Sequence, residues 1–446
     1  MRKKLDLEKG NLSELFISFA MPATISLIMT FLYSVADGIF ITRGVGSNGI
    51  AAVNIGYPII NFTVALSLMF GIGGATLITF KKGNIRLQNR YFTHIIFLNV
   101  VVYIIVAAII FLFTNPVMMA LGASEELLPM IKGYMYPCTV STSFLMIATS
   151  LNAVVRSDNA PKRAMQSTLI GAGMNIVLDY LFIFKLHLGI EGGAYATAIS
   201  QIAAAIYLCR HFVGSTFKLD LSWRKLNFKI MRRIINIGFP SFILEFAVAV
   251  ITVLLNIAFM KEAGVFAASA YGIISYSFML FRMLFTGLSQ GIQPIVSYNY
   301  GKRNYERTKE ILAYTHKVTF VISLISLVLI IFFGKYMVNI FTSDKELLKE
   351  SVKGFILYSA ALSFLGFNFV NIAYLQAIDK PRISNVICMS RSFVFVFIGL
   401  LILPKFLGIN GIWLSLPFAD FVTAILTLPF YKKITNSYNE ALKNKA

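Results

Sequence analysis

The chain has 446 residues, of which 57% are hydrophobic and only 13% are charged. Long apolar runs recur along its whole length, which excludes a soluble globular protein and is typical of a polytopic membrane protein. The formal net charge of +20 could indicate binding to nucleic acid, but the basic residues lie in the connections between apolar runs, which is typical of membrane topology instead.

We predict twelve transmembrane helices, because about 20 consecutive apolar residues cross a bilayer as a helix. The first apolar run follows a basic start, contains Asp37 and is not followed by a small-residue cleavage site. It is therefore interpreted as a retained helix and not as a signal peptide. The predicted spans begin near residues 15, 51, 92, 130, 163, 191, 233, 266, 314, 350, 386 and 409.

The first span is preceded by an amphipathic segment from Leu5 to Leu15, which we expect to lie at the membrane interface. Pro22 and Gly38 are weak points of the span, and Asp37 lies near its outer end. Tyr33 precedes Asp37 by one helical turn on the same face, where its phenol could hydrogen-bond the carboxylate.

The fifth span, Ala164 to Phe184, contains Asn175 and Asp179 within otherwise apolar sequence. These two residues are four apart, so they project from the same helical face. A carboxylate inside a membrane is costly and normally faces a partner or a water-filled path. Two functions remain open from this pattern: a hydrogen bond that joins neighbouring helices, or an ion-coupling site of a transporter.

Basic residues are concentrated in alternate connections and at both ends of the chain, which predicts that both termini are cytoplasmic in a multi-pass protein of the cell inner or plasma membrane. The segment between spans six and seven, residues 213–232, interleaves basic and apolar residues, as expected of a linker at the membrane surface. The basic segments are 1–4, 81–90, 156–163, 210–233, 302–317, 380–391 and 432–445.

An internal repeat relates the two halves at an offset of 218 to 220 residues, which predicts a six-helix lobe at 1–212 and another at 233–446. Because six spans return the chain to the same side, the repeats are parallel, and a substrate path is expected between the lobes. The matching pairs are Phe19-Ala-Met-Pro22 with Ile237-Gly-Phe-Pro240, Lys82-Gly83 with Tyr300-Gly301, Asn159-Ala-Pro161-Lys with Asp379-Lys-Pro381-Arg, and His187-Leu-Gly-Ile-Glu-Gly192 with Phe406-Leu-Gly-Ile-Asn-Gly411.

The three cysteines, Cys138, Cys209 and Cys388, are scattered through apolar spans, and the four histidines do not cluster. We therefore predict no disulfide framework, no metal site beyond a coupling Na⁺, and no cofactor; the cysteines are expected to be inert core residues.

The residues at this point resemble those of the multidrug and toxic compound extrusion (MATE) family, over essentially the whole chain. The resemblance depends on two six-helix halves, on Gly287-Leu-Ser-Gln-Gly291-Ile-Gln-Pro294 in span eight, and on the acidic and amide residues of the first and fifth spans. It is strongest to the bacterial branch that contains DinF-like and MepA-like exporters. The resemblance implies an all-α integral membrane fold with twelve helices in two pseudo-symmetric lobes. Within span eight, Gly287 and Gly291 are also candidates for close helix contact.

Members of this family are secondary antiporters that export organic cations in exchange for Na⁺ or H⁺ and are not enzymes. The resemblance to the DinF-like branch implies a coupling-ion cluster in the first lobe, comprising Asp37, Asn175, Asp179, Thr197, Tyr33 and Asn152. The NorM-like branch has acidic residues in helices seven and ten. Here helix seven contains Glu245, but helix ten offers only Asn368 and Asn371, so a complete cation site in the second lobe is not expected.

Three further ionisable residues in spans of the second half are candidates for the substrate cavity. Glu245 and Arg282 lie about equally far on either side of the turn near Gly264, so we predict that they interact, as a lock of the hairpin or as part of the cavity. Asp420 has no obvious partner in the sequence, and its counterpart in the repeat is about Gln201, which favours an architectural contact.

Asp37 and Asp179 differ from these residues, because no basic residue is expected at their depth and their repeat counterparts, Leu255 and about Gly399, are not ionisable. Two carboxylates in a poorly solvated pocket cannot both ionise cheaply, so one is expected to hold a proton near neutral pH. The same oxygens could instead bind Na⁺, and the sequence leaves H⁺ and Na⁺ open.

The predicted function is efflux of cationic amphipathic compounds by alternating access, in exchange for H⁺ or Na⁺. The predicted partners are small organic cations and the lipid bilayer, with no nucleic acid, and the protein is expected to be a monomer. A flippase for a lipid-linked precursor is the alternative, but it would favour a strongly basic cavity, and Arg282 is the one basic residue expected at mid-membrane depth. An integral membrane enzyme would need clustered nucleophiles or metal ligands at membrane depth.

Overall fold

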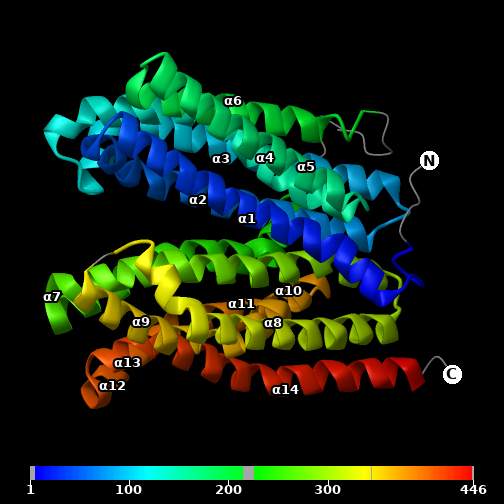
Figure 1. Ribbon diagram of the computed structural model, residues 1–446. Coiled ribbons are helices and arrows are strands. Elements are labelled where there is room, and N and C mark those ends of the chain that lie inside the picture. The colour runs from blue at the N-terminus through cyan, green and yellow to red at the C-terminus, as the bar shows by residue number, and fades with distance from the viewer. Residues whose placement is uncertain (1–5, 214–225, 343, 444–446) are drawn as a thin grey trace. The chain divides into compact units, whose positions relative to one another are not determined.

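A computed structural model describes residues 6–213, 226–342 and 344–443, and all regular secondary structure in these ranges is helical (Figure 1). Most of the predicted linker at 213–232, namely residues 214–225, lies outside the described residues.

The helices follow the predicted spans closely. The first half contains α1 (Leu12–Gly44), α2 (Ser47–Phe80), α3 (Ile85–Ala120), α4 (Leu128–Ser157), α5 (Pro161–Asp179) and α6 (Gly189–Cys209). The second half contains α7 (Phe228–Gly301), α8 (Tyr305–Asn339), α9 (Lys345–Ser359), α10 (Leu362–Ala377), α11 (Pro381–Met389), α12 (Phe395–Leu407), α13 (Ile409–Trp413) and α14 (Ser415–Lys443).

Nine helical stretches of the described residues are long and apolar enough to cross a membrane. One of them is α7, whose 74 residues form two spans because the backbone leaves helical geometry at Ala263 and Gly264. The bent pair α9 and α10 makes a further span, and α14 carries a shorter apolar stretch. These helices together account for the twelve predicted spans.

The internal repeat is visible in the backbone as well as in the sequence. Asn159 and Asp379, at the turns before α5 and α11, both adopt a left-handed conformation, with φ of 64° and 57°. Gly189 and Gly408 form another such pair, with φ of 60° and 55°. A residue with positive φ is uncommon unless it is glycine, so its recurrence at an offset of 219 or 220 indicates two copies of one fold.

One sequence match is two residues out of structural register. The left-handed residue at the turn after α2 is Gly83, and its counterpart after α7 is Arg303, with φ of 103° and 60°. Gly301, which the sequence pairs with Gly83, is instead the last residue of α7. The conformation of the turn therefore recurs at an offset of 220, although the glycine does not.

The chain divides into two compact units, which we call the first unit (residues 25–242) and the second unit (residues 1–24 and 243–446). The beginning of α1 thus belongs to the second unit, and the beginning of α7 belongs to the first.

In the second unit, a Cβ at Gly291 would overlap the backbone of Ala20. In the first unit, a Cβ at Gly238 would overlap the backbone of Met69. These glycines let helix backbones meet closely, as sequence analysis predicts for Gly291.

The segment before α1 and the first turn of α1, which contains Leu15, pack within the second unit. Leu7 and Leu15 are buried, and the Asn299 side-chain amide donates a hydrogen bond of 2.8 Å to the carbonyl of Leu7.

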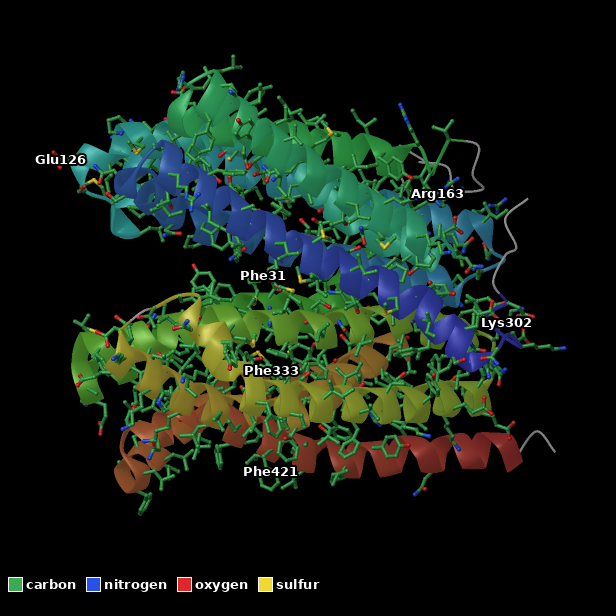
Figure 2. The ribbon with its side chains drawn as sticks, in the orientation of Figure 1. Phe31, Glu126, Arg163, Lys302, Phe333 and Phe421 are labelled. Carbon is green, nitrogen blue, oxygen red and sulfur yellow. The ribbon has the colours of Figure 1, made fainter. Side chains whose placement is uncertain are left out.

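In the first unit, Glu126 and Arg163 lie at opposite ends of the helices (Figure 2). The acidic α3–α4 connection and the basic α4–α5 connection are therefore separated by the length of a span.

Candidate ion-binding site

The end of α1 packs beside the end of α5 in the first unit. The rings of Phe40 and Phe184 meet edge to face at 5.8 Å, and Gly44 lies directly against Ile183. Ile183 and Phe184 belong to a π-helical segment, Tyr180–Lys185, which follows α5 without a break. π-Helical turns are rare and frequently occur at functional sites. The end of α5, where Asp179 lies, is therefore a candidate functional position.

This packing brings together the two carboxylates predicted from the sequence. The carboxyl groups of Asp37 and Asp179 lie within hydrogen-bonding reach of each other. Asp179 is completely buried, whereas Asp37 is half-buried. Two carboxylates can share a hydrogen bond only if one of them carries a proton, so the pair as a unit is suited to hold one additional cation.

Several buried oxygens of this cluster lack a donor among the described residues. Both carboxylate oxygens of Asp179, Oδ1 of Asp37 and Oδ1 of Asn175 receive no hydrogen bond from an N–H or a hydroxyl group. Buried polar atoms without a partner are rare in folded proteins, and each calls for a physical explanation such as an ion, a proton or a water molecule. The cluster therefore has the acceptor chemistry that a proton or a small hard cation requires.

The amide and hydroxyl groups are divided between two places. Asn175 donates a hydrogen bond of 3.3 Å to the hydroxyl of Thr197 on α6, so Thr197 joins the cluster. Asn152 on α4 instead donates to the carbonyl of Ala164, at 2.9 Å, and contacts the hydroxyl of Thr168. Thr168 precedes Asp179 by eleven residues of α5, or about 16 Å along the axis. The structure thus does not bring Asn152 next to the carboxylates.

Three residues of α2 and α4 extend the cluster beyond the sequence prediction. Tyr134 and Cys138 on α4 lie within hydrogen-bonding reach of each other, and both lie close enough to Asp37 for electrostatic interaction. Tyr33 lies close enough to both aspartates for electrostatic interaction, and it also interacts with Tyr57 on α2. In the sequence, Tyr134 and Cys138 are not distinguishable from ordinary packing residues of an apolar helix. Their i, i+4 spacing is the signal that they lie on the same helical face.

Apolar side chains enclose the deep side of the cluster. Ile41, Ile131, Met135 and Ile183 are buried with Tyr134 and Cys138 in one hydrophobic core. No ion pair joins Asp37 or Asp179 to a basic side chain in the described part of the chain. Electrostatic interactions are strong in such surroundings, so gain or loss of a cation at the pair carries a large free-energy change.

The second unit contains the predicted contact between Glu245 and Arg282. Nη2 of Arg282 lies 3.5 Å from the Glu245 carboxylate and donates a hydrogen bond of 2.9 Å to the carbonyl of Leu244. The Arg282 side chain is 10% exposed and that of Glu245 is 24% exposed. The pair therefore joins the two spans of α7 on either side of Gly264.

The expectation that Asp420 has no obvious partner is wrong. Nε and Nη2 of Arg391 bind its two oxygens at 2.6 and 3.0 Å, and the Asn368 amide donates to Oδ1 at 2.9 Å. Sequence analysis places Arg391 in a basic connection, but it lies ten residues beyond the start of α11, in a π-helical segment. Arg156, placed in another basic connection, is inside α4 and only 5% exposed. Arg282 is thus not alone among buried arginines.

One further prediction concerned the cysteines. Cys138 and Cys388 are buried and free, as expected, but Cys209 at the end of α6 is exposed. A buried core position for Cys209 is therefore wrong, because α6 ends at this residue and leaves its side chain uncovered.

The duplicated helical fold and the buried carboxylate pair are those of a polytopic membrane transporter. The MatE family model matches residues 22–181 and again residues 240–401, one match in each half. The chain belongs to the MatE family. Proteins of this family are membrane transporters and not enzymes.

Two relatives illustrate the similarity along the sequence. The chain is 26% identical over 428 residues to the multidrug export protein MepA of Staphylococcus aureus (strain MSSA476), with 94% of each chain covered. It is 27% identical over 428 residues to MepA of Staphylococcus haemolyticus (strain JCSC1435), covering 94% of this chain and 93% of the relative. A solved structure described as MATE in the straight conformation matches with a TM-score of 0.90 at 21% identity, covering 99% of this chain and 100% of the other.

Proposed function

We propose that this protein is a secondary active multidrug exporter, which expels cationic amphipathic compounds in exchange for H⁺ or Na⁺ by alternating access. The observation that carries the proposal is the cluster of Asp37, Asn175 and Asp179, whose buried oxygens lack donors and counter-ions among the described residues. The S. aureus and S. haemolyticus relatives, named multidrug export proteins, support the substrate class.

The coupling step follows from the charge of the pair. With the cluster open to the outside, one H⁺ or Na⁺ binds between Asp37 and Asp179 and neutralises part of their charge. With the cluster open to the cytoplasm, the ion leaves, and the restored negative charge favours entry of a cationic substrate. Asn175 and Thr197 hold the side of the cluster and supply additional oxygens. Each state is stabilised by a different occupant, which is the requirement for coupled exchange.

The available driving force is sufficient for drug export. One proton that crosses a potential of about 100 mV releases about 2.3 kcal/mol. A difference of one pH unit adds about 1.4 kcal/mol. For exchange against an uncharged substrate, these amounts support a concentration ratio of a few hundred-fold. For one-for-one exchange against a monovalent cation the contribution of the potential cancels, and the pH difference alone supports a ratio of about tenfold.

The membrane orientation is part of the same proposal. With both termini in the cytoplasm of a cell-membrane protein, the basic α4–α5 connection faces inward and the acidic α3–α4 connection faces outward, in agreement with the positive-inside rule. Asp37 and Asp179 then lie towards the outer ends of their helices, where an ion arriving from outside reaches them first.

The alternative of a lipid-precursor flippase would require a basic cavity for an anionic headgroup. Two of the buried arginines lie in the second unit: Arg391 is bound by Asp420, and Arg282 contacts Glu245. Their charges are therefore compensated within the second unit, and export of cations is the better account.

Counterflow in proteoliposomes tests the proposal. A fluorescent organic cation is loaded, and a pH gradient and a Na⁺ gradient are imposed separately; acceleration by one of them identifies the coupling ion. Transport that responds to neither gradient would exclude secondary antiport. In the same assay, Asp179→Asn is expected to abolish gradient-driven efflux at unchanged expression, because the neutral amide has no proton to release and no negative charge for a cation to compensate. Full efflux in this variant removes Asp179 from the mechanism.

A further inference from the structure

The second unit contains a buried aspartate that is surrounded as if for recognition of a cation. Asp420 is fully buried, and its carboxylate is held by Asn368, whose amide donates to both Oδ1 and the main-chain carbonyl of Asp420, at 2.9 and 2.8 Å. The ring of Phe369 lies 4.8 Å from the Arg391 guanidinium carbon. A carboxylate at the edge and an aromatic face are the two elements that recognise planar organic cations.

The occupant of this site is a side chain of the protein itself. Arg391 places Nε and Nη2 on the two oxygens of Asp420 at 2.6 and 3.0 Å, in the two-pronged geometry that a guanidinium prefers. The Arg391 side chain is 6% exposed and that of Asp420 is 0% exposed. Both charges are therefore removed from solvent, and each compensates the other.

Helix packing alone does not explain the pair. Removing two charges from water is costly, and apolar residues of similar volume commonly join helices at least as well. At the corresponding positions of the first unit, the chain has Gly171 and Gln201, so the duplicated scaffold forms without this ion pair. Arg391 also lies in a π-helical segment, Ser390–Val394, as Asp179 directly precedes one in the first unit. A specific electrostatic role is the better account.

We propose that Arg391 is a tethered cation that permanently fills a guanidinium site formed by Asp420, Asn368 and Phe369, so that the second unit takes up no coupling ion. Both units contain a fully buried aspartate, Asp179 and Asp420. Only the second supplies its own counter-charge among the described residues. Ion exchange is thereby restricted to the first unit; this last consequence rests on the proposed function, whereas the guanidinium site does not.

Chemical rescue tests the site directly. Arg391→Ala leaves the Asp420 carboxylate buried without a cation, so the purified variant is expected to melt at a lower temperature than the wild type. Millimolar methylguanidinium should restore at least half of the lost melting temperature, whereas equal concentrations of tetramethylammonium or Na⁺ should not. The wild type and the Arg391→Ala/Asp420→Asn variant are the controls and should show no such rise. Absence of a guanidinium-specific rise in Arg391→Ala, or an equal rise in the double variant, overturns the proposal.

A second measurement covers the case in which Arg391→Ala does not fold. Arg391→Met/Asp420→Asn removes both charges and keeps the volume, and it is expected to transport with the same ratio of ions to substrate as the wild type. A lower ratio in this variant would show that the pair itself exchanges an ion, which overturns the inference that the second unit takes up no coupling ion. A wild type without ion-driven transport would contradict the proposed function alone, because the melting experiment still decides the guanidinium site.

Discussion

Single residues in this protein differ most in whether the chain itself compensates their charge. Asp37 and Asp179 lie together without a basic side chain beside them among the described residues, whereas Asp420 is bound by Arg391 and Glu245 contacts Arg282. An uncompensated buried carboxylate has a large affinity for a cation. At the residue scale we therefore propose ion exchange for the first pair, whereas the Glu245–Arg282 pair joins the two spans of α7 and Arg391 compensates the charge of Asp420.

Glu245→Gln tests whether the contact with Arg282 stabilises the two spans of α7. The substitution removes the negative charge beside the Arg282 guanidinium and leaves it only neutral oxygen acceptors, such as the Leu244 carbonyl, among the described contacts. We expect a loss of about 1 to 2 kcal/mol of stability, below the value for a fully buried pair because the Glu245 side chain is 24% exposed. Thermal unfolding in detergent measures the loss.

The matching double variant, Glu245→Gln/Arg282→Met, separates the pair from its surroundings. It should recover most of the lost stability, because no unpaired charge remains buried. Additive losses from the two single substitutions would contradict an interaction between Glu245 and Arg282.

At the scale of helices, close backbone contacts determine which ends belong to which unit. The beginning of α1 packs against α7 through Gly291, and a Cβ there would overlap Ala20. Gly291→Ala is therefore expected to force the two helices apart, with loss of transport and a lower melting temperature. Gly272→Ala on the same helix α7 has open space around its Cβ and serves as the control, which should retain both. Equal behaviour of the two variants would argue against a packing role for Gly291.

Helix starts repeat between the two halves with the same chemistry. The Asn84 side chain accepts a hydrogen bond from the Leu87 N–H at the start of α3, at 3.1 Å. Asn304 does the same for the Arg307 N–H at the start of α8, at 3.2 Å. Replacing either asparagine by alanine should cost about 1 kcal/mol, measured as a shift in thermal unfolding. Asn84→Asp and Asn304→Asp keep an acceptor at the cap and should be close to the wild type; similar losses in the aspartate variants would exclude capping as the cause.

At the scale of the whole molecule, the proposed orientation in the membrane can be checked by labelling. In a variant without Cys138, Cys209 and Cys388, we expect Ser124→Cys in the α3–α4 connection to react with a membrane-impermeant thiol reagent in intact cells. Lys302→Cys, in the basic turn between α7 and α8, should react only after permeabilisation. Reaction of both sites from outside would contradict the placement of the basic connections in the cytoplasm.

The number of spans, the duplication and most of the candidate ion-binding cluster are predictable from the sequence alone. Apolar runs of membrane-spanning length are a local property, because the bilayer imposes one length on every helix. The four-residue spacing of Asn175 and Asp179 also follows from one helix, and Thr197 joined them through family resemblance. A charged group in an apolar span is a strong signal even without a fold.

Which side chains meet became known from the packing of the helices. The sequence places Arg391 in a basic connection because α11 begins beside basic residues, and its partner Asp420 comes from a different helix, 29 residues later. The packing of α4 places Tyr134 and Cys138 near Asp37 and keeps Asn152 away from the carboxylates. The physical reason is that burial and pairing depend on neighbours from other helices, whose depth and rotation no single span encodes.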